Sequence, residues 1–114
     1  MVRLYRVDAN RVQLVTKQSV PGGKEPGSVR FSPDGKVIAV AFNDAAAVNV
    51  LAADTLAFLF APSVTGLDKD AVLAVAWSAD GQTLHAATAV GPTSTNVLMR
   101  NWSQAGRGAA TDVA

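Results

Sequence analysis

The sequence predicts an all-β chain built from four-stranded antiparallel sheets, and three observations support this fold class. A segment of fourteen residues occurs twice, short apolar runs alternate with turn signals, and the flanking β-branched and aromatic residues favour strands over an amphipathic helix. Hydrophobic residues make up 49% of the 114 residues and charged residues 17%, which is ample core material for one small domain.

The repeat aligns residues 28–41 with residues 74–87, without gaps, at an offset of 46 residues. Five positions are identical, and one aromatic residue matches another. Each copy has a short apolar strand that ends in the aromatic residue, then Ser-x-Asp-Gly, then a second strand. Because Asp and Gly favour tight hairpin turns, we expect hairpins that turn at Asp34-Gly35 and at Asp80-Gly81.

Apolar runs separated by turn residues predict the other strands of each repeat. The Pro/Gly-rich segment 21–27 is too short for a domain linker and joins one repeat to the next. The expected third strands are 47–51 and 96–102, the expected fourth strand is 56–60 with another beginning within 106–113, and 2–7 and 12–16 fit the third and fourth strands of an earlier unit.

A four-stranded sheet repeated every 40 to 45 residues is typical of a β-propeller blade. We therefore expect four-stranded antiparallel blades of a β-propeller that form an incomplete ring. The predicted division is the second half of one blade at 1–25, a complete blade at 28–62 and most of a third blade at 72–114.

The segments Phe31-Ser32-Pro33-Asp34-Gly35 and Trp77-Ser78-Ala79-Asp80-Gly81 resemble the aromatic-Ser-Pro-Asp-Gly hairpin of WD-repeat propellers. The resemblance implies that this hairpin joins the first two strands of a blade and that the fourth strand lies at the rim. The family's third strand usually ends in Trp-Asp. The matching positions here are Tyr5-Arg6, Leu51-Ala52 and Trp102-Ser103, so the WD dipeptide is absent, as is the Gly-His pair.

Two and a half blades cannot close a ring, because propellers typically have four to eight. Open ends would leave unpaired strand edges, and the uncharged strand 37–42 is an aggregation hazard when exposed. We expect either that the chain is a fragment of a longer propeller or that copies associate head to tail through their open blade edges. Phe31 and Trp77, which share a repeat position, are expected to lie buried between neighbouring sheets.

The residues that could carry catalysis are few. His85 is the single histidine, Ser78 and Ser103 lack a nucleophile-elbow motif, and there is no cysteine. Asp34 and Asp80 recur at the same place in two hairpins, where the turn accounts for both. We therefore expect no enzyme activity, no catalytic residue, no metal site and no cofactor.

Basic residues exceed acidic ones in residues 1–36, by seven to three, but they form no cluster, so nucleic-acid binding is not expected. The longest uninterrupted apolar run, 71–77, is far shorter than the roughly 20 residues of a membrane-spanning helix. No membrane association is expected, and the cytoplasm is the default compartment.

The expected function is that of a non-enzymatic protein-interaction scaffold, as the resemblance to WD-repeat propellers implies. One alternative is an enzyme or small-ligand sensor whose channel site lies in blades outside this sequence, and another is a self-assembling structural module. The resemblance places partner contacts on loops between strands and between blades. The candidate partner-binding residues are Lys24, Glu25, Asn43, Asp44, Asp68, Lys69, Asp70, Pro92 and Thr93.

Overall fold

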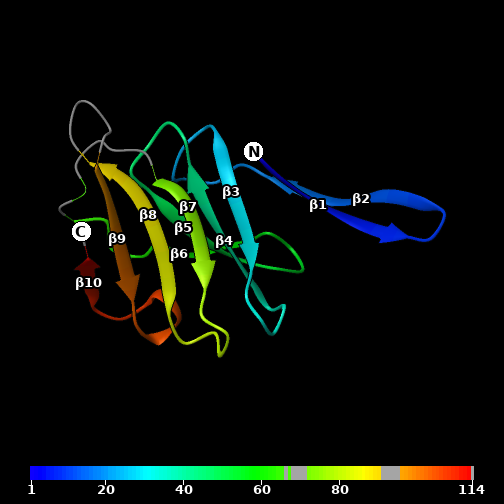
Figure 1. Ribbon diagram of the computed structural model, residues 1–114. Helices are drawn as coiled ribbons and strands as arrows, with labels where there is room; N and C mark the ends of the chain where they lie inside the picture. The colour runs from blue at the N-terminus through cyan, green and yellow to red at the C-terminus, as the bar shows by residue number, and fades with distance from the viewer. Residues whose placement is uncertain (66, 68–71, 91–95, 114) are drawn as a thin grey trace.

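The computed structural model describes residues 1–65, 67, 72–90 and 96–113, and within these residues the chain is all-β, with no α-helix. The strands form two four-stranded antiparallel sheets and one two-stranded ribbon (Figure 1). A short 3-10 turn, η1 (Gln104–Gly106), precedes the last strand. The strands are β1 (Val2–Asp8), β2 (Arg11–Gln18), β3 (Pro26–Phe31), β4 (Val37–Phe42), β5 (Val48–Ala52), β6 (Phe58–Phe60), β7 (Val72–Trp77), β8 (Leu84–Val90), β9 (Asn96–Trp102) and β10 (Ala110–Val113).

Most of these strands lie where the sequence predicts them, including β10, which begins within 106–113, but β6 is shorter than predicted. β6 begins at Phe58 and not at Leu56, because Leu56 adopts φ 62° in a turn and donates its N–H to the Ala52 carbonyl at 2.8 Å. β10 begins at Ala110, because the residues from Gln104 to Gly106 form η1. Both strands therefore follow a turn with left-handed backbone, which a run of apolar residues in the sequence does not reveal.

The two predicted hairpin turns are confirmed, and they share one hydrogen-bond pattern. In the turn between β3 and β4, the Ser32 hydroxyl donates to Asp34 Oδ1 at 2.6 Å, and Gly35 has φ 73°. In the turn between β7 and β8, the Ser78 hydroxyl donates to Asp80 Oδ1 at 2.6 Å, and the following glycine also has φ 73°. Glycine is required there because other residues rarely adopt this backbone conformation.

Consecutive strands are neighbours in both sheets, in the order β3-β4-β5-β6 in the first sheet and β7-β8-β9-β10 in the second sheet. Every pairing is antiparallel. β10 pairs with β9 and so provides the fourth strand of the second sheet. The described residues form two open sheets side by side and no closed ring (Figure 1).

The first sheet packs on the second through one face of each. We call the contributing face of the first sheet its back, and the receiving face of the second sheet its front. The buried residues of the back are small, and the front has two large ones, Leu84 and Trp102, that are fully buried. The buried residues at this junction are Ala39, Ala41, Val48 and Val50 from the back, and Val75, Leu84, Ala86 and Trp102 from the front.

The β1–β2 ribbon, which we call the arm, extends away from the two sheets (Figure 1). Its base lies on the other face of the first sheet, where Val2 and the partly buried Leu4 pack against a second buried cluster. This face is the front of the first sheet, and its buried residues include Ile38, Val40, Phe42 and Leu51. The arm, the first sheet and the second sheet therefore follow one another in the same back-on-front relation.

The prediction that Phe31 and Trp77 are both buried is wrong for Phe31. Its side chain is 55% exposed, whereas Trp77 is half-buried, packs against the core between the sheets and donates its indole N–H to the Arg30 carbonyl at 3.1 Å. Trp77 lies beside β3, but the arm has only two strands and provides no equivalent strand in front of Phe31. The exposure of this position is therefore set by the neighbouring unit.

Candidate functional site

Four of the predicted partner-binding residues lie together on one loop cluster. The Asp44 carboxylate accepts the backbone N–H of Lys24 at 2.9 Å and that of Glu25 at 3.2 Å, and the Asn43 N–H donates to the Glu25 carbonyl at 2.8 Å. The hydrogen bond from the Lys24 N–H holds the pKa of Asp44 below its usual value. All four residues are exposed, but Asp44 already serves to fix the connector before β3.

The other predicted partner-binding residues, Asp68, Lys69, Asp70, Pro92 and Thr93, lie outside the described residues. Their role in partner binding stays a prediction.

The polar residues that could act in catalysis are engaged in structural contacts. His85 Nδ1 and Asn101 Oδ1, on neighbouring strands, lie 2.5 Å apart. The Ser32 hydroxyl is the main cause that lowers the pKa of Asp34, and the Ser78 hydroxyl does the same for Asp80, so each carboxylate is held in its own hairpin turn. Among the described residues, no three His, Asp or Glu side chains are grouped so that they could hold a metal ion.

A buried arginine that the sequence analysis did not single out fixes the connector before the second sheet. Arg100 on β9 is almost fully buried and forms a bidentate ion pair with Asp112 on β10, at 2.7 and 2.8 Å. Its guanidinium also donates to the carbonyls of Ser63 at 3.2 Å and Thr65 at 2.7 Å. Trp102 donates its indole N–H to the same Ser63 carbonyl at 2.9 Å.

Asn49 fixes the connector before the first sheet in the same way. Its side-chain oxygen accepts the Gly22 N–H at 2.8 Å, and the side chain is buried. Strand pairing places Asn49 and Arg100 at equivalent positions, because Asn49 pairs with Val40, Arg100 pairs with Ala86, and the repeat aligns residue 40 with residue 86. A buried polar residue on the third strand thus ties down the connector that precedes its own sheet. This buried polar position is recognised when the third strands are aligned by their pairing with the second strands, and not only by turn residues.

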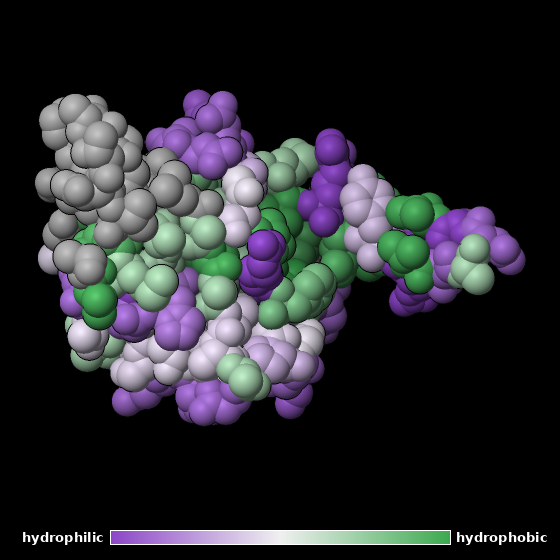
Figure 2. All heavy atoms as spheres, viewed as in Figure 1, coloured by the Kyte–Doolittle hydropathy of each residue, from purple (hydrophilic) through white to green (hydrophobic). Residues whose placement is uncertain are grey.

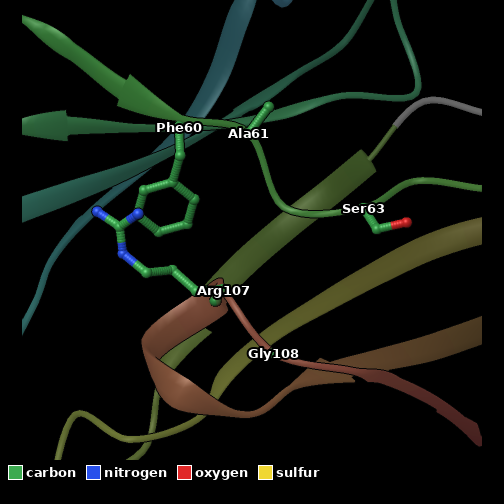
Figure 3. A pocket seen from close by; sticks show the side chains of 6 residues that line it. Phe60, Ala61, Ser63, Arg107 and Gly108 are labelled. Atoms are coloured by element: carbon green, nitrogen blue, oxygen red, sulfur yellow. The ribbon is translucent and has the colours of Figure 1, made fainter.

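An open hollow of about 310 Å³ lies at the outer end of the junction between the sheets. The Arg107 guanidinium lies against the Phe60 ring (Figure 3), 3.9 Å from the centre of the ring. The backbone N–H groups of Gly106, Arg107 and Gly108 donate to carbonyls of Ser103 and Gln104, so they are not free for an anion. Without converging donors, this hollow does not favour a specific small ligand.

The arm has an apolar face that the rest of the described chain leaves exposed. Tyr5 lies opposite Leu14 and Val7 opposite Val12, so the four side chains share one face. Their exposed fractions are 48%, 46%, 73% and 65% in that order. We call this face the arm front; Figure 2 shows hydrophobic side chains exposed on the arm. On the opposite face, Arg6 pairs with Gln13 and Asp8 with Arg11, so this face is polar.

The second sheet also has an exposed face, opposite its buried front. Ala74 pairs with Ala87, and Ala87 pairs with Met99, so these residues share one face. Ala74 and Ala76 are exposed, and Met99 is 46% exposed. We call this face the back of the second sheet, because it is equivalent to the packed back of the first sheet.

No protein-family model matches the chain, and no curated protein matches it. The described part of the chain has no helix of the length and apolar character that would cross a membrane.

Proposed function

We propose that this chain is a non-enzymatic protein-interaction module, built from WD-repeat-like propeller blades, that binds another polypeptide through the arm front. The observation that carries the proposal is the clustering of Tyr5, Val7, Val12 and Leu14 on one exposed face of a projecting ribbon. Contiguous exposed apolar surface marks interaction sites in folded proteins, and tyrosine is enriched among the residues that dominate binding energy.

The order of strands and the stacking of the sheets support the propeller part of the proposal. Each four-stranded sheet has its strands in sequence order, as a blade does, and the sheets pack back on front. The loop cluster of Lys24, Glu25, Asn43 and Asp44 is a secondary contact region in this proposal, because its backbone is held in place while the Lys24 and Glu25 side chains stay exposed.

The stability of the arm supports a binding role in a second way. A two-stranded hairpin alone is marginal in water, and only the base of this one is packed on the first sheet. Burying the arm front against a partner would supply the apolar contact that the outer part of the ribbon lacks.

Photo-crosslinking in living cells tests the proposal. A photoreactive amino acid is placed at position 12, on the arm front, and in a matched chain at position 13, on the opposite polar face. We expect a discrete crosslinked protein product from position 12 and none from position 13. Equal products from both positions, or none from either, would contradict binding through the arm front.

A further inference from the structure

We propose that the partner of the arm front is the back of the second sheet in another copy of this chain, so that copies join head to tail. This inference rests on the proposed function and names its partner. The contact would repeat the back-on-front packing that already occurs twice within each chain. Its two surfaces are the exposed faces at the two ends of the stack.

The repeat supplies the template for the contact. Within the chain, the back of the first sheet packs on the front of the second, and the base of the arm packs on the front of the first. Strand pairing makes Leu51 and Trp102 equivalent positions on the fronts, and the sequence comparison matches Tyr5 with them. Leu51 and Trp102 are fully buried, and Tyr5 is 48% exposed. The arm front is thus the one front among the described units that has no back against it.

Alanines on the back of the second sheet leave room for large side chains. At the junction inside the chain, Ala39 and Ala41 on the back lie against a front that includes Trp102 and Leu84. The back of the second sheet has alanine at positions 74, 76 and 87, and strand pairing also places His85, Met99 and Asn101 on this face. Packing Tyr5 and Leu14 of the arm front over these alanines would repeat the pairing of large and small side chains that the chain already has.

The charge distribution is compatible with this head-to-tail contact. Residues 1–36, which include the arm, have seven Lys and Arg against three Asp and Glu, and residues 37–114 have three against six. The second sheet, residues 72–113, has Asp80 and Asp112 against Arg100 and Arg107, so the basic arm of one copy meets a sheet without net charge in another. An arm-to-arm contact would instead bring two basic segments together, which is unfavourable.

The contact is packing of faces and not insertion of a missing strand. The fourth position of the second sheet is occupied by the chain's own β10, so β1 of a neighbour has no vacant place between strands there. Such an interface uses two different surfaces of the molecule, and it therefore generates a ring or an open chain of copies.

Two variants and one control test the proposal. The arm variant carries Tyr5→Lys and Val12→Glu, which place opposite charges diagonally across the ribbon and so spare the arm itself. The back variant carries Ala76→Glu and Met99→Lys at exposed positions of the second sheet. The control carries Leu59→Lys, an exposed apolar position on β6 outside both faces. Circular dichroism verifies that each variant keeps its strands.

Mass is measured by sedimentation over a range of concentrations. We expect the natural chain and the control to form assemblies that grow with concentration, and each of the two variants alone to be monomeric. An equal mixture of the two variants should give a species of two copies, because one intact arm front then meets one intact back.

Three results would overturn the proposal. The first is a natural chain that stays monomeric, and the second is a mixture that stays monomeric although the natural chain assembles. The third is a back variant that still dimerises while the arm variant does not, since this would indicate an arm-to-arm contact. A monomeric natural chain that still gives a crosslink from position 12 to a different protein would remove self-association and leave the proposed interaction function standing.

Discussion

The two junctions inside the molecule have the same back-on-front packing, but they differ in the number of strands and buried residues that take part. Between the first and second sheets, four strands lie against four, and the residues at the centre are fully buried. Between the arm and the first sheet, two strands lie against four, and Val2 and Leu4 of the arm join the buried cluster. The difference shows that the back-on-front relation holds even where half of a unit is present.

The same comparison explains why equivalent residues have different surroundings. Trp77 has β3 beside it and is half-buried, whereas Phe31 has no strand in front of it and is exposed. Burial at a repeat position is therefore a property of the next unit as much as of the residue. Predictions that compare equivalent positions in the two junctions test this directly.

The largest expected difference is between Trp102 and its equivalent in the arm, Tyr5. Trp102→Ala should lower the free energy of unfolding by about 3 to 5 kcal/mol, because it removes a fully buried ring and leaves a cavity. Tyr5→Ala should change it by less than about 0.5 kcal/mol, because that side chain is exposed. Chemical denaturation of both variants measures the difference, and equal effects would show that the arm front is covered within the chain.

The sequence was sufficient to predict the all-β class, both hairpin turns and the bounds of β9. These features depend on local signals: alternating apolar runs and an Asp-Gly turn with its serine. The arm front was not predicted, because Tyr5 and Val7 have the same apolar character as buried strand residues. Their exposure follows from the number of strands that the arm has, which no local pattern contains.

The connectors provide the next comparison, through Arg100 and Asn49. Arg100→Ala should lower the free energy of unfolding by about 1 to 3 kcal/mol, because the Thr65 carbonyl loses its donor and the Ser63 carbonyl loses one of its two donors. Asn49→Ala should have a smaller effect, because one hydrogen bond to its connector is lost and not two. Denaturation curves measure both effects. A larger effect of Asn49→Ala would show that the arginine is not the principal tie of its connector.

The pair of aromatic residues at the hairpin ends gives a smaller contrast. Trp77→Ala should lower the free energy of unfolding by about 1 to 3 kcal/mol, since a half-buried ring and its hydrogen bond to Arg30 are lost. Phe31→Ala should change it by less than about 0.5 kcal/mol. A Phe31→Ala variant that is destabilised as much as Trp77→Ala would contradict the open front of β3.

The smallest expected effect is a dependence of stability on acid pH. The hydrogen bond from Arg100 is the main cause that lowers the pKa of Asp112 from its ordinary value of 3.8. A carboxylate whose pKa is lower in the folded state stabilises that state above the unfolded pKa, and this contribution is lost as pH falls through the folded pKa. Unfolding measured below pH 4 should therefore show a shallower loss of stability in Asp112→Asn than in the natural chain, and an unchanged slope would contradict the ion pair.

Hydroxyl-radical footprinting of the intact chain tests the central claim most directly, because it reports the accessibility of each aromatic side chain without a substitution. Rates are compared with those of the same residues in the unfolded chain. We predict little protection for Phe31, whose ring is exposed at the open front of β3, and strong protection for Phe42 and Trp102, which are fully buried. Protection of Phe31 equal to that of Phe42, at a concentration where the chain is monomeric, would contradict the account.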